Sequence, residues 1–207
     1  MAGCCGAVAK PADVLAFWFG AYPLETPVPA EVRRQWFQKD EAFDRRLRAR
    51  FGVTLLEAFA GRLTDWTASA EGWLALIVLL DQFPRNAFRG HPASFAGDAQ
   101  ALDLALGGLA RKRDQELPPV ARLFCYLPLE HAEQLALQDR AVELIEALAE
   151  LPVDADSNAF FRGNADYARR HRDVIRQYGR FPHRNAILGR TSTPEESAYL
   201  ARPGAGF

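Results

Sequence analysis

Residues 157–178 read SNAFFRGNADYARRHRDVIRQY, and this stretch decides the fold class. At about 100° per residue, its large apolar side chains fall on one stripe of an α-helix, formed by Phe160, Tyr167, Val174, Ile175 and Tyr178. The alternation of apolar and polar residues that is typical of a β-strand is missing here and is never sustained elsewhere. Good helix formers (Ala, Leu, Arg, Glu and Gln) dominate the remaining chain. The sequence therefore predicts an all-α protein.

Proline and glycine punctuation divides the chain into nine predicted helices with short connections. Gly52, for example, is interpreted as the end of one helix before the next begins. Short connections favour antiparallel helical hairpins within a single domain over residues 11–202, with tails at 1–10 and 203–207. The helices are predicted at 11–20, 30–50, 53–62, 71–83, 93–111, 118–127, 130–150, 157–178 and 194–201.

Composition, charge and cysteine content argue against several classes of protein function. The 207 residues carry 25 basic and 26 acidic side chains, a net charge of -1, so nucleic acid and membranes are not expected as partners. The longest apolar run, residues 73–80, is too short to span a bilayer, and no secretory segment follows the N-terminus. Cys4, Cys5 and Cys125 form no disulfide framework. We expect a cytoplasmic protein.

The sequence also lacks the common motifs that indicate a bound cofactor, a metal ion or a catalytic nucleophile. The sequence holds no phosphate-binding loop, dinucleotide fingerprint, zinc-ligand spacing or hydrolase nucleophile elbow. None of the four histidines follows a glutamate by three residues, which excludes the usual helical di-iron site. The sequence leaves the identity of any cofactor unknown and assigns no metal ligands.

Polar residues interrupt two of the predicted apolar stripes. Asp40 falls in the middle of the stripe of helix 30–50, with Asp44 at its edge, so each needs a partner. A buried ion pair between helices and a ligand contact both explain them. Asn164 and His171 lie inside the stripe of helix 157–178, where a core role and a functional role are equally open.

Carboxylates also fall at predicted helix ends. Glu130 and His131 lie at the start of helix 130–150, where a glutamate suits the helix dipole and could simply be a cap. Asp81 lies near the end of the apolar helix 71–83, where the dipole disfavours a carboxylate. We therefore expect an arginine partner for Asp81, drawn from Arg85, Arg89 and Arg184.

One short segment occurs twice. Residues 82–86 read QFPRN, and residues 180–185 read RFPHRN with one residue inserted. Each proline is predicted to stop a helix and to turn the following arginine and asparagine outward. The repeat is either a shared helix-stop device or part of a common site. The site hypothesis expects one region to contain Arg85, Asn86, His131, His171, His183, Arg184 and Asn185.

These segments are where the chain resembles a known family. The strings FWFG at 17–20, LDQFPRN at 80–86, YLPLEH at 126–131 and GRFPHRN at 179–185 are similar to those of a largely bacterial family of unknown function. The resemblance runs from about residue 12 to residue 202. It implies an all-helical fold similar to a tetratricopeptide-repeat superhelical bundle, and no established reaction. Ala132 departs from the family pattern, which favours serine after the histidine.

The residues support two main hypotheses of function. The first is a pocket for a small polar or anionic molecule, with His131 and His171 as general acid/base catalysts. Its ligand contacts would be Asp40, Asp81, Arg85, Asn86, Glu130, His183, Arg184 and Asn185. The second is a tetratricopeptide-repeat-like scaffold that binds a peptide or a protein partner. A purely architectural polar network is the remaining alternative.

Overall fold

The computed structural model describes residues 7–24 and 26–206, and over these residues it contains helices and no strand. The all-α prediction is confirmed. Cys4 and Cys5 lie outside the described residues. The chain divides into two compact units, Met1–Arg89 with Ala93–Pro128 and Gly90–Pro92 with Leu129–Phe207. Each unit is described by itself below. No helix of the described chain is long and apolar enough to cross a membrane.

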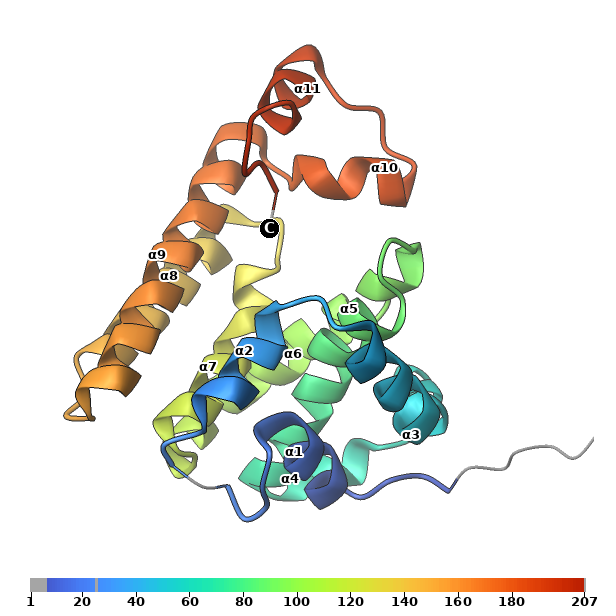
Figure 1. The fold of residues 1–207 in the computed structure, drawn as a ribbon, viewed down its shortest axis with the longest axis vertical. Coiled ribbons are helices and arrows are strands. Elements are labelled where there is room, and N and C mark those ends of the chain that lie inside the picture. The colour runs from blue at the N-terminus through green and yellow to red at the C-terminus, as the bar shows by residue number, and fades with distance from the viewer. Residues whose placement is uncertain (1–6, 25, 207) are drawn as a thin grey trace, which may run out of the picture. The chain divides into compact units, whose positions relative to one another are not determined.

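The first unit is built around an aromatic core. Trp18 packs against Trp36, Phe83 and Phe124 with ring centroids 5.7–6.4 Å apart, and Trp36 Nε1 donates a hydrogen bond to the Trp18 carbonyl at 2.7 Å. The helices are α1 (Pro11–Phe19), α2 (Ala30–Phe37), α3 (Glu41–Phe59), α4 (Ala70–Ile77), α5 (Phe83–Ala87), α6 (Asp98–Leu109) and α7 (Pro119–Glu130), which continues into the second unit (Figure 1). Aromatic burial of this extent supplies the main driving force for folding this unit.

The predicted helix over 30–50 is broken in the structure. α2 ends at Phe37, and the chain restarts at Glu41 with Asp40 as the N-cap, whose side chain accepts hydrogen bonds from the amides of Ala42 and Phe43. Asp40 is therefore exposed, and its predicted place on a buried stripe was wrong. A second correction concerns Gly52, which lies inside α3 and ends no helix. The cap residue outweighed the apolar period at position 40, because capping satisfies otherwise orphaned amides.

The predicted helix stop after Asp81 is also wrong. Residues Val78–Gln82 form one turn of π-helix, and the chain continues through Phe83 and Pro84 into α5. Pro84 falls in the first turn of α5, where a missing N–H costs little. The turn is closed by the Phe83 amide, which donates to the Val78 carbonyl. Asp81 thus lies within a continuous helical segment.

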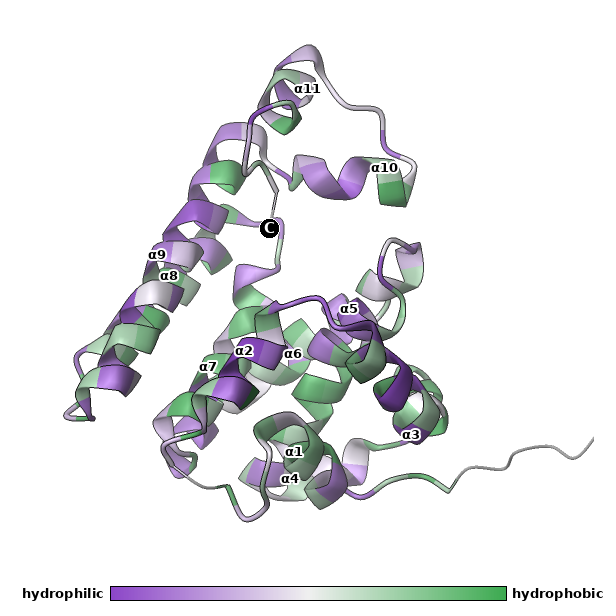
Figure 2. Ribbon diagram, viewed as in Figure 1, coloured by the Kyte–Doolittle hydropathy of each residue, from purple (hydrophilic) through white to green (hydrophobic). Residues whose placement is uncertain are grey.

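The second unit contains a long helical hairpin followed by two short helices. α8 (Leu135–Ala149) and α9 (Ala155–Tyr178) lie side by side, and α10 (Asn185–Leu188) and α11 (Pro194–Leu200) follow (Figure 1). Hydrophilic residues alternate with hydrophobic ones along α9, as Figure 2 shows. The capping box expected at the start of the last helix is present, with Thr193 and Glu196 bonding each other's backbone amides.

Two sequence expectations fail in the second unit. α7 runs through Pro128 to Glu130 and α8 begins only at Leu135, so Glu130 ends one helix and His131 follows it, and neither starts the next helix. On α9 the buried face includes Phe161 instead of Phe160, while Tyr167 is 36% exposed. Packing against α8 therefore turns α9 slightly from the predicted stripe, although His171 stays buried.

Candidate functional site

The second unit contains a buried carboxylate–histidine pair. His171 Nδ1 lies 3.1 Å from Glu130 Oε1, and both side chains are about 95% buried, with exposed fractions of 5% and 4%. Glu130 is the last residue of α7, and His171 projects from the middle of α9. The two residues come from the segments that the sequence singled out. The structure brings them together as a close, buried pair.

The surroundings of His171 define its protonation state. Its Nδ1 is also 3.0 Å from the Tyr167 carbonyl oxygen, so two acceptors face this nitrogen. Two acceptors require that Nδ1 carries the hydrogen, which leaves the lone pair on Nε2 in the neutral ring. Burial lowers the pKa of His171 well below its usual value, and His131, His183 and Arg184 lower it further. The neutral, Nδ1-protonated ring is therefore the stable form at neutral pH.

Positively charged and basic side chains gather around this pair. His131, His183 and Arg184 all act electrostatically on His171. The Phe181 ring is a shared platform: its centroid lies 5.5 Å from those of His171 and His183, and the Arg184 guanidinium carbon lies 4.5 Å above it. We call Glu130, His131, His171, His183 and Arg184 the histidine cluster. All five were predicted site residues.

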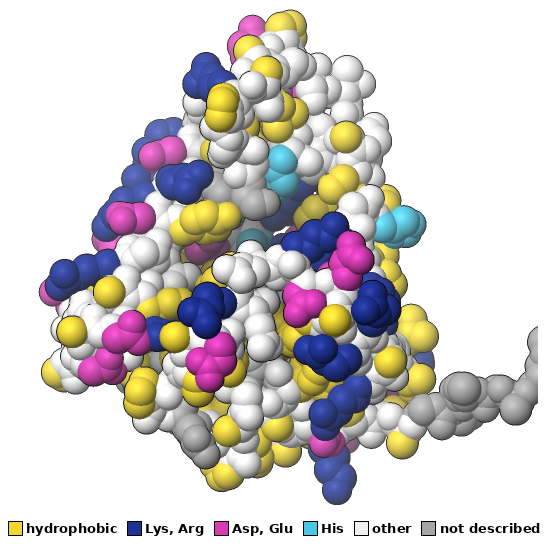
Figure 3. All heavy atoms as spheres, viewed as in Figure 1, with side chains coloured by type: hydrophobic (Ala, Val, Ile, Leu, Met, Phe, Trp, Pro, Cys, Tyr) yellow, Lys and Arg dark blue, Asp and Glu magenta, His cyan; other side chains and the backbone are white. Residues whose placement is uncertain are grey.

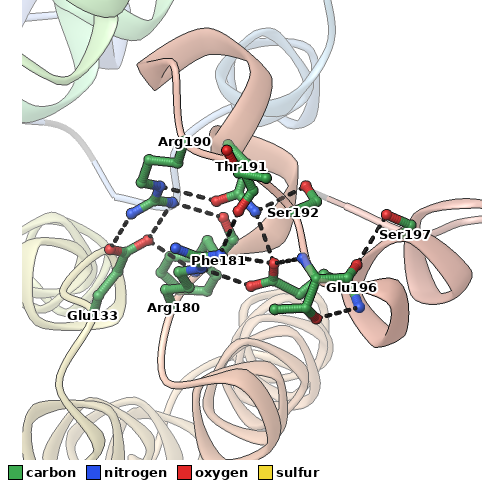
Figure 4. Close-up of polar contacts among 10 residues, drawn as sticks. Glu133, Arg180, Phe181, Arg190, Thr191, Ser192, Glu196 and Ser197 are labelled. Atoms are coloured by element: carbon green, nitrogen blue, oxygen red, sulfur yellow. Dashed lines mark hydrogen bonds and ion pairs between the residues drawn. The ribbon is translucent and has the colours of Figure 1, made fainter.

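The turn that carries His183 and Arg184 is fixed by ion pairs, shown in Figure 4. Gly179 ends α9 in the left-handed conformation, and Pro182 then begins a short 3-10 turn. Arg180 forms a bidentate pair with the buried Glu196, at 2.6 and 2.8 Å. The Glu196 carboxylate also accepts from Asn185 at 3.1 Å. Asn185, a predicted ligand residue, is thus buried in the frame of the turn.

A second ion pair closes the same turn from the other side. Glu133 accepts a hydrogen bond from the Phe181 amide at 2.8 Å, and Arg190 donates to the Phe181 carbonyl at 3.0 Å. The two side chains form a bidentate pair at 2.7 and 3.0 Å (Figure 4). Burial raises the pKa of Glu133, but the hydrogen bonds from Arg190 and Phe181 outweigh burial and lower it overall. The carboxylate is therefore ionised at neutral pH.

The other predicted residues lie in the first unit. Asp81 is completely buried, accepts a hydrogen bond from the Gln82 amide at 2.6 Å and forms an ion pair with Arg85 at 3.7 Å. The expected arginine partner is therefore present, but this contact is an ion pair, longer than the hydrogen bond expected for Asp81. Arg85 also makes a bidentate pair with Asp98, at 2.7 and 3.1 Å. These contacts tie the π-helical turn to α6.

Asn86 and Asp44 belong to a neighbouring polar group. Arg89 donates to Asp44 at 2.6 Å and also bonds Asn86 Oδ1. The Asn86 amide in turn donates to the Gln82 carbonyl at 3.2 Å. Asp44 is buried, so the predicted ion pair between helical segments is confirmed for this residue. Asp40, by contrast, accepts its capping hydrogen bonds from the amides of Ala42 and Phe43.

The two copies of the repeated segment have different local structures. In the first copy Phe83 is helical, and Pro84 continues the helix. In the second copy Phe181 is extended, and Pro182 opens a 3-10 turn after the end of α9. The shared helix-stop interpretation therefore holds only for the second copy. Whether Arg85 and Asn86 share a region with the second copy stays a prediction.

Sequence reasoning missed the residues that frame the cluster: Glu133, Gln138, Arg180, Arg190 and Glu196. Gln138 is buried, and its amide donates to the carbonyls of Glu130 and Ala132. The frame connects positions 48 and 57 residues apart, and no local pattern marks such partners. The sequence signal among them was Arg180, which opens the repeated segment RFPHRN.

Other features of the described chain give weaker evidence for a functional site. Over residues 7–24 and 26–206, no three His, Cys, Asp or Glu side chains are grouped so as to hold a metal ion. A groove on the α8–α9 hairpin has walls that include Glu146, Asp166 and Arg169, which pair with one another. Figure 3 shows acidic and basic side chains interspersed over this part of the surface. The groove is lined by more carboxylates than arginines, so it does not favour an anionic ligand.

Comparison with known proteins agrees with this architecture. Residues 14–204 match the family described as "Bacterial protein of unknown function (DUF924)". The chain belongs to the DUF924 family. A solved structure, that of the protein of unknown function ATU0120 from Agrobacterium tumefaciens, is similar to this DUF924 protein with a TM-score of 0.76 and 39% identity. The similarity covers 92% of this chain and 96% of that chain. No curated protein matches the sequence at a significant level.

Proposed function

We propose that this DUF924 protein binds a small anionic molecule at the histidine cluster and that His171 acts there as a general base. The observation that carries the proposal is the 3.1 Å contact between Glu130 Oε1 and His171 Nδ1. A carboxylate that accepts from Nδ1 fixes the ring and its tautomer, and directs the basic Nε2 away from the carboxylate. A carboxylate on Nδ1 of a proton-accepting histidine is also the arrangement in Ser-His-Asp triads.

The charge around the pair supports an anionic ligand. Arg184 is buried, and the stacking of its guanidinium on Phe181 restricts its orientation. A planar guanidinium binds phosphate or carboxylate through two parallel hydrogen bonds. His131 and His183 add further donors and are half-buried. His131, which directly follows Glu130 in the chain, is our candidate for the general acid that complements His171.

The proposal does not depend on the remaining predicted ligand contacts. Asp81, Arg85 and Asn86 have partners that anchor the π-helical turn, and Asp40 caps α3. Their contact with the same ligand stays a prediction. The alternative of a tetratricopeptide-repeat-like scaffold for a peptide or protein also stays a prediction, because the observations above do not favour a particular partner.

Anion titration tests the binding part of the proposal. Inorganic phosphate and acetate are titrated separately into protein with isotope-labelled histidines, and the side-chain NMR signals are followed. We expect saturable shifts of the His171 and His183 signals, and the anion that binds more tightly identifies the class. Arg184→Gln should weaken that binding by about ten-fold or more, the value of one charge-assisted hydrogen bond.

Arg169→Gln is the matched control, because Arg169 bonds Glu146 and Asp166 on the outer surface of the hairpin. It should bind phosphate or acetate like the unmodified protein. Shifts that do not saturate with either anion, or equal binding by Arg184→Gln, would contradict the binding proposal. The general-base role is tested by screening phosphate and carboxylate esters for hydrolysis. A hydrolysis rate equal in His171→Asn and the unmodified protein would contradict that role.

A further inference from the structure

The histidine cluster depends on the placement of one aromatic ring. Phe181 is fully buried, and its ring contacts His171, His183 and Arg184, three of the five cluster residues. A movement of Phe181 would therefore move the surface against which both Arg184 and His183 are packed. The position of this residue sets the distance between the positive side chains and the His171 ring.

The backbone of Phe181 is held on both sides by a single ion pair. Its N–H donates to Glu133 Oε1 at 2.8 Å, and its C=O accepts from Arg190 Nη2 at 3.0 Å. Arg190 also holds Asn185 by two hydrogen bonds. Its Nε donates to Asn185 Oδ1 at 2.9 Å, and its backbone N–H donates to the Asn185 carbonyl at 2.8 Å. The segment 181–185 is thereby fastened at its beginning and at its end.

The other end of the ion pair lies in the turn that carries Glu130 and His131. Glu133 follows Glu130 by three residues, and Gln138 bonds the carbonyls of Glu130 and Ala132 in the same turn. Glu133 and Arg190 therefore join the two turns that hold the cluster, one after α7 and the other after α9. Their side chains are 27% and 23% exposed, which screens the pair only partly from solvent.

We infer that Glu133 and Arg190 are positioning residues, which hold Phe181 so that His183 and Arg184 face His171. The inference rests on the proposed function for its biological meaning, but the placement itself can be measured without a ligand. In this arrangement the ion pair needs no contact with the bound anion. Its loss lets the 181–185 turn move and separates the positive side chains from His171.

The experiment measures the pKa of His171 by side-chain NMR in Glu133→Gln. Because nearby positive groups oppose protonation of His171, we expect the variant to show a higher His171 pKa, as Arg184→Gln also should. If Glu133 acts through the turn, the double variant Glu133→Gln/Arg184→Gln should shift the His171 pKa by less than the sum of the two single shifts, because only the effect of His183 remains to be lost. Additive shifts in the double variant, or no shift in Glu133→Gln, would overturn the inference.

A stability control separates positioning from general loosening. Ile145→Val removes one methylene from the fully buried core of the α8–α9 hairpin and should lower the melting temperature without moving the His171 pKa. An equal pKa shift in Ile145→Val would mean that loosening alone explains the effect. Arg190→Lys keeps the charge but loses the planar fork, and provides the same test if Glu133→Gln does not fold.

The anion titration distinguishes this inference from the proposed function. Phosphate that does not bind the unmodified protein, together with a shifted His171 pKa in Glu133→Gln, would reject the proposed ligand class and keep the positioning role. If phosphate binds the unmodified protein but the His171 pKa is unchanged in Glu133→Gln, the ligand class is kept and the positioning role is rejected. If both hold, Glu133→Gln should weaken phosphate binding by a factor similar to that for Arg184→Gln.

Discussion

The carboxylate of Asp81 is buried between an amide and a guanidinium, from Gln82 and Arg85. Asp81→Ala removes the acceptor of the Gln82 amide and leaves Arg85 with Asp98 as its remaining carboxylate. We expect a loss of about 2–3 kcal/mol in the free energy of unfolding, the cost of buried polar groups left unsatisfied. Urea denaturation measures this loss. A midpoint equal to that of the unmodified protein would refute the structural role of Asp81.

Glu196 provides a second prediction at the scale of one residue. The hydrogen bond from Arg180, with those from Thr193 and Asn185, lowers the pKa of Glu196 from 4.5 to about 2. A lowered folded-state pKa stabilises the protein above the unfolded value of about 4.5, and this contribution is lost as the pH falls toward about 2. The stability difference between the unmodified protein and Glu196→Gln should therefore shrink over this range.

Denaturation midpoints of the two proteins at several pH values between 5 and 2 provide the measurement for Glu196. Glu195→Gln, on the exposed first turn of the same helix, is the matched control. A constant difference between the unmodified protein and Glu196→Gln across this pH range would contradict the predicted linkage.

At the scale of one helix, two adjacent glycines of α6 have opposite surroundings. A Cβ on Gly108 would lie 2.2 Å from Trp73 Cζ2, whereas a Cβ on Gly107 would meet nothing within 4 Å. Trp73 is also fixed by its hydrogen bond to the Leu104 carbonyl at 2.8 Å. Gly108→Ala should destabilise the protein by about 1–3 kcal/mol through overpacking. Gly107→Ala should be neutral or stabilising by up to about 1 kcal/mol, because alanine favours helix.

Thermal unfolding of the two alanine variants compares them directly. The two variants make the same chemical change one residue apart, so each is the control of the other. Equal melting temperatures would show that α6 can move away from Trp73. The result would then contradict the close packing of α4 and α6.

The predicted helices failed where a local contact outweighed the apolar period. Asp40 lies on the apolar stripe by its spacing, yet its oxygen caps α3. Pro84 and Pro128 lie within helical segments, although proline was interpreted as a stop. Pro84 occupies a first turn, where its missing N–H costs little, and α7 ends only two residues after Pro128. Sequence spacing identified the faces, but it could not rank these competing local preferences.

At the scale of the whole molecule, tryptophan fluorescence can test the prediction of a single domain, because it reports on the first compact unit. All four tryptophans (Trp18, Trp36, Trp66 and Trp73) lie in the first compact unit. Ile145 lies in the core of the second unit. Because α7 continues from one unit into the other without a linker, we expect cooperative unfolding. Ile145→Ala should then lower the free energy of unfolding by about 2–5 kcal/mol. The urea midpoints from tryptophan fluorescence and from circular dichroism should fall together.

Urea titrations followed by both signals measure this coupling. Gly108→Ala, in the first unit, tests the reverse direction and should move both midpoints together as well. A fluorescence midpoint that stays unchanged in Ile145→Ala would show that the units unfold separately. The chain would then behave as two domains.

The sequence alone determined the all-α class, the stripes that bury Phe43, Leu47 and Ile145, and the polar residues that depart from those stripes. These properties follow from helical periodicity and from the cost of burying an unpaired charge, both of which are local. It also singled out Glu130 and His171, because polar groups in apolar surroundings stand out without any knowledge of their partners.

Only the tertiary structure decided which partners those groups have. Glu130 meets His171 across two helices, and Glu133 meets Phe181 and Arg190 from 48 and 57 residues away. The partner of a buried charge is chosen by how helices pack, and many arrangements of the same helices would satisfy the same local pattern. The frame around the histidine cluster therefore became visible only once the chain was folded.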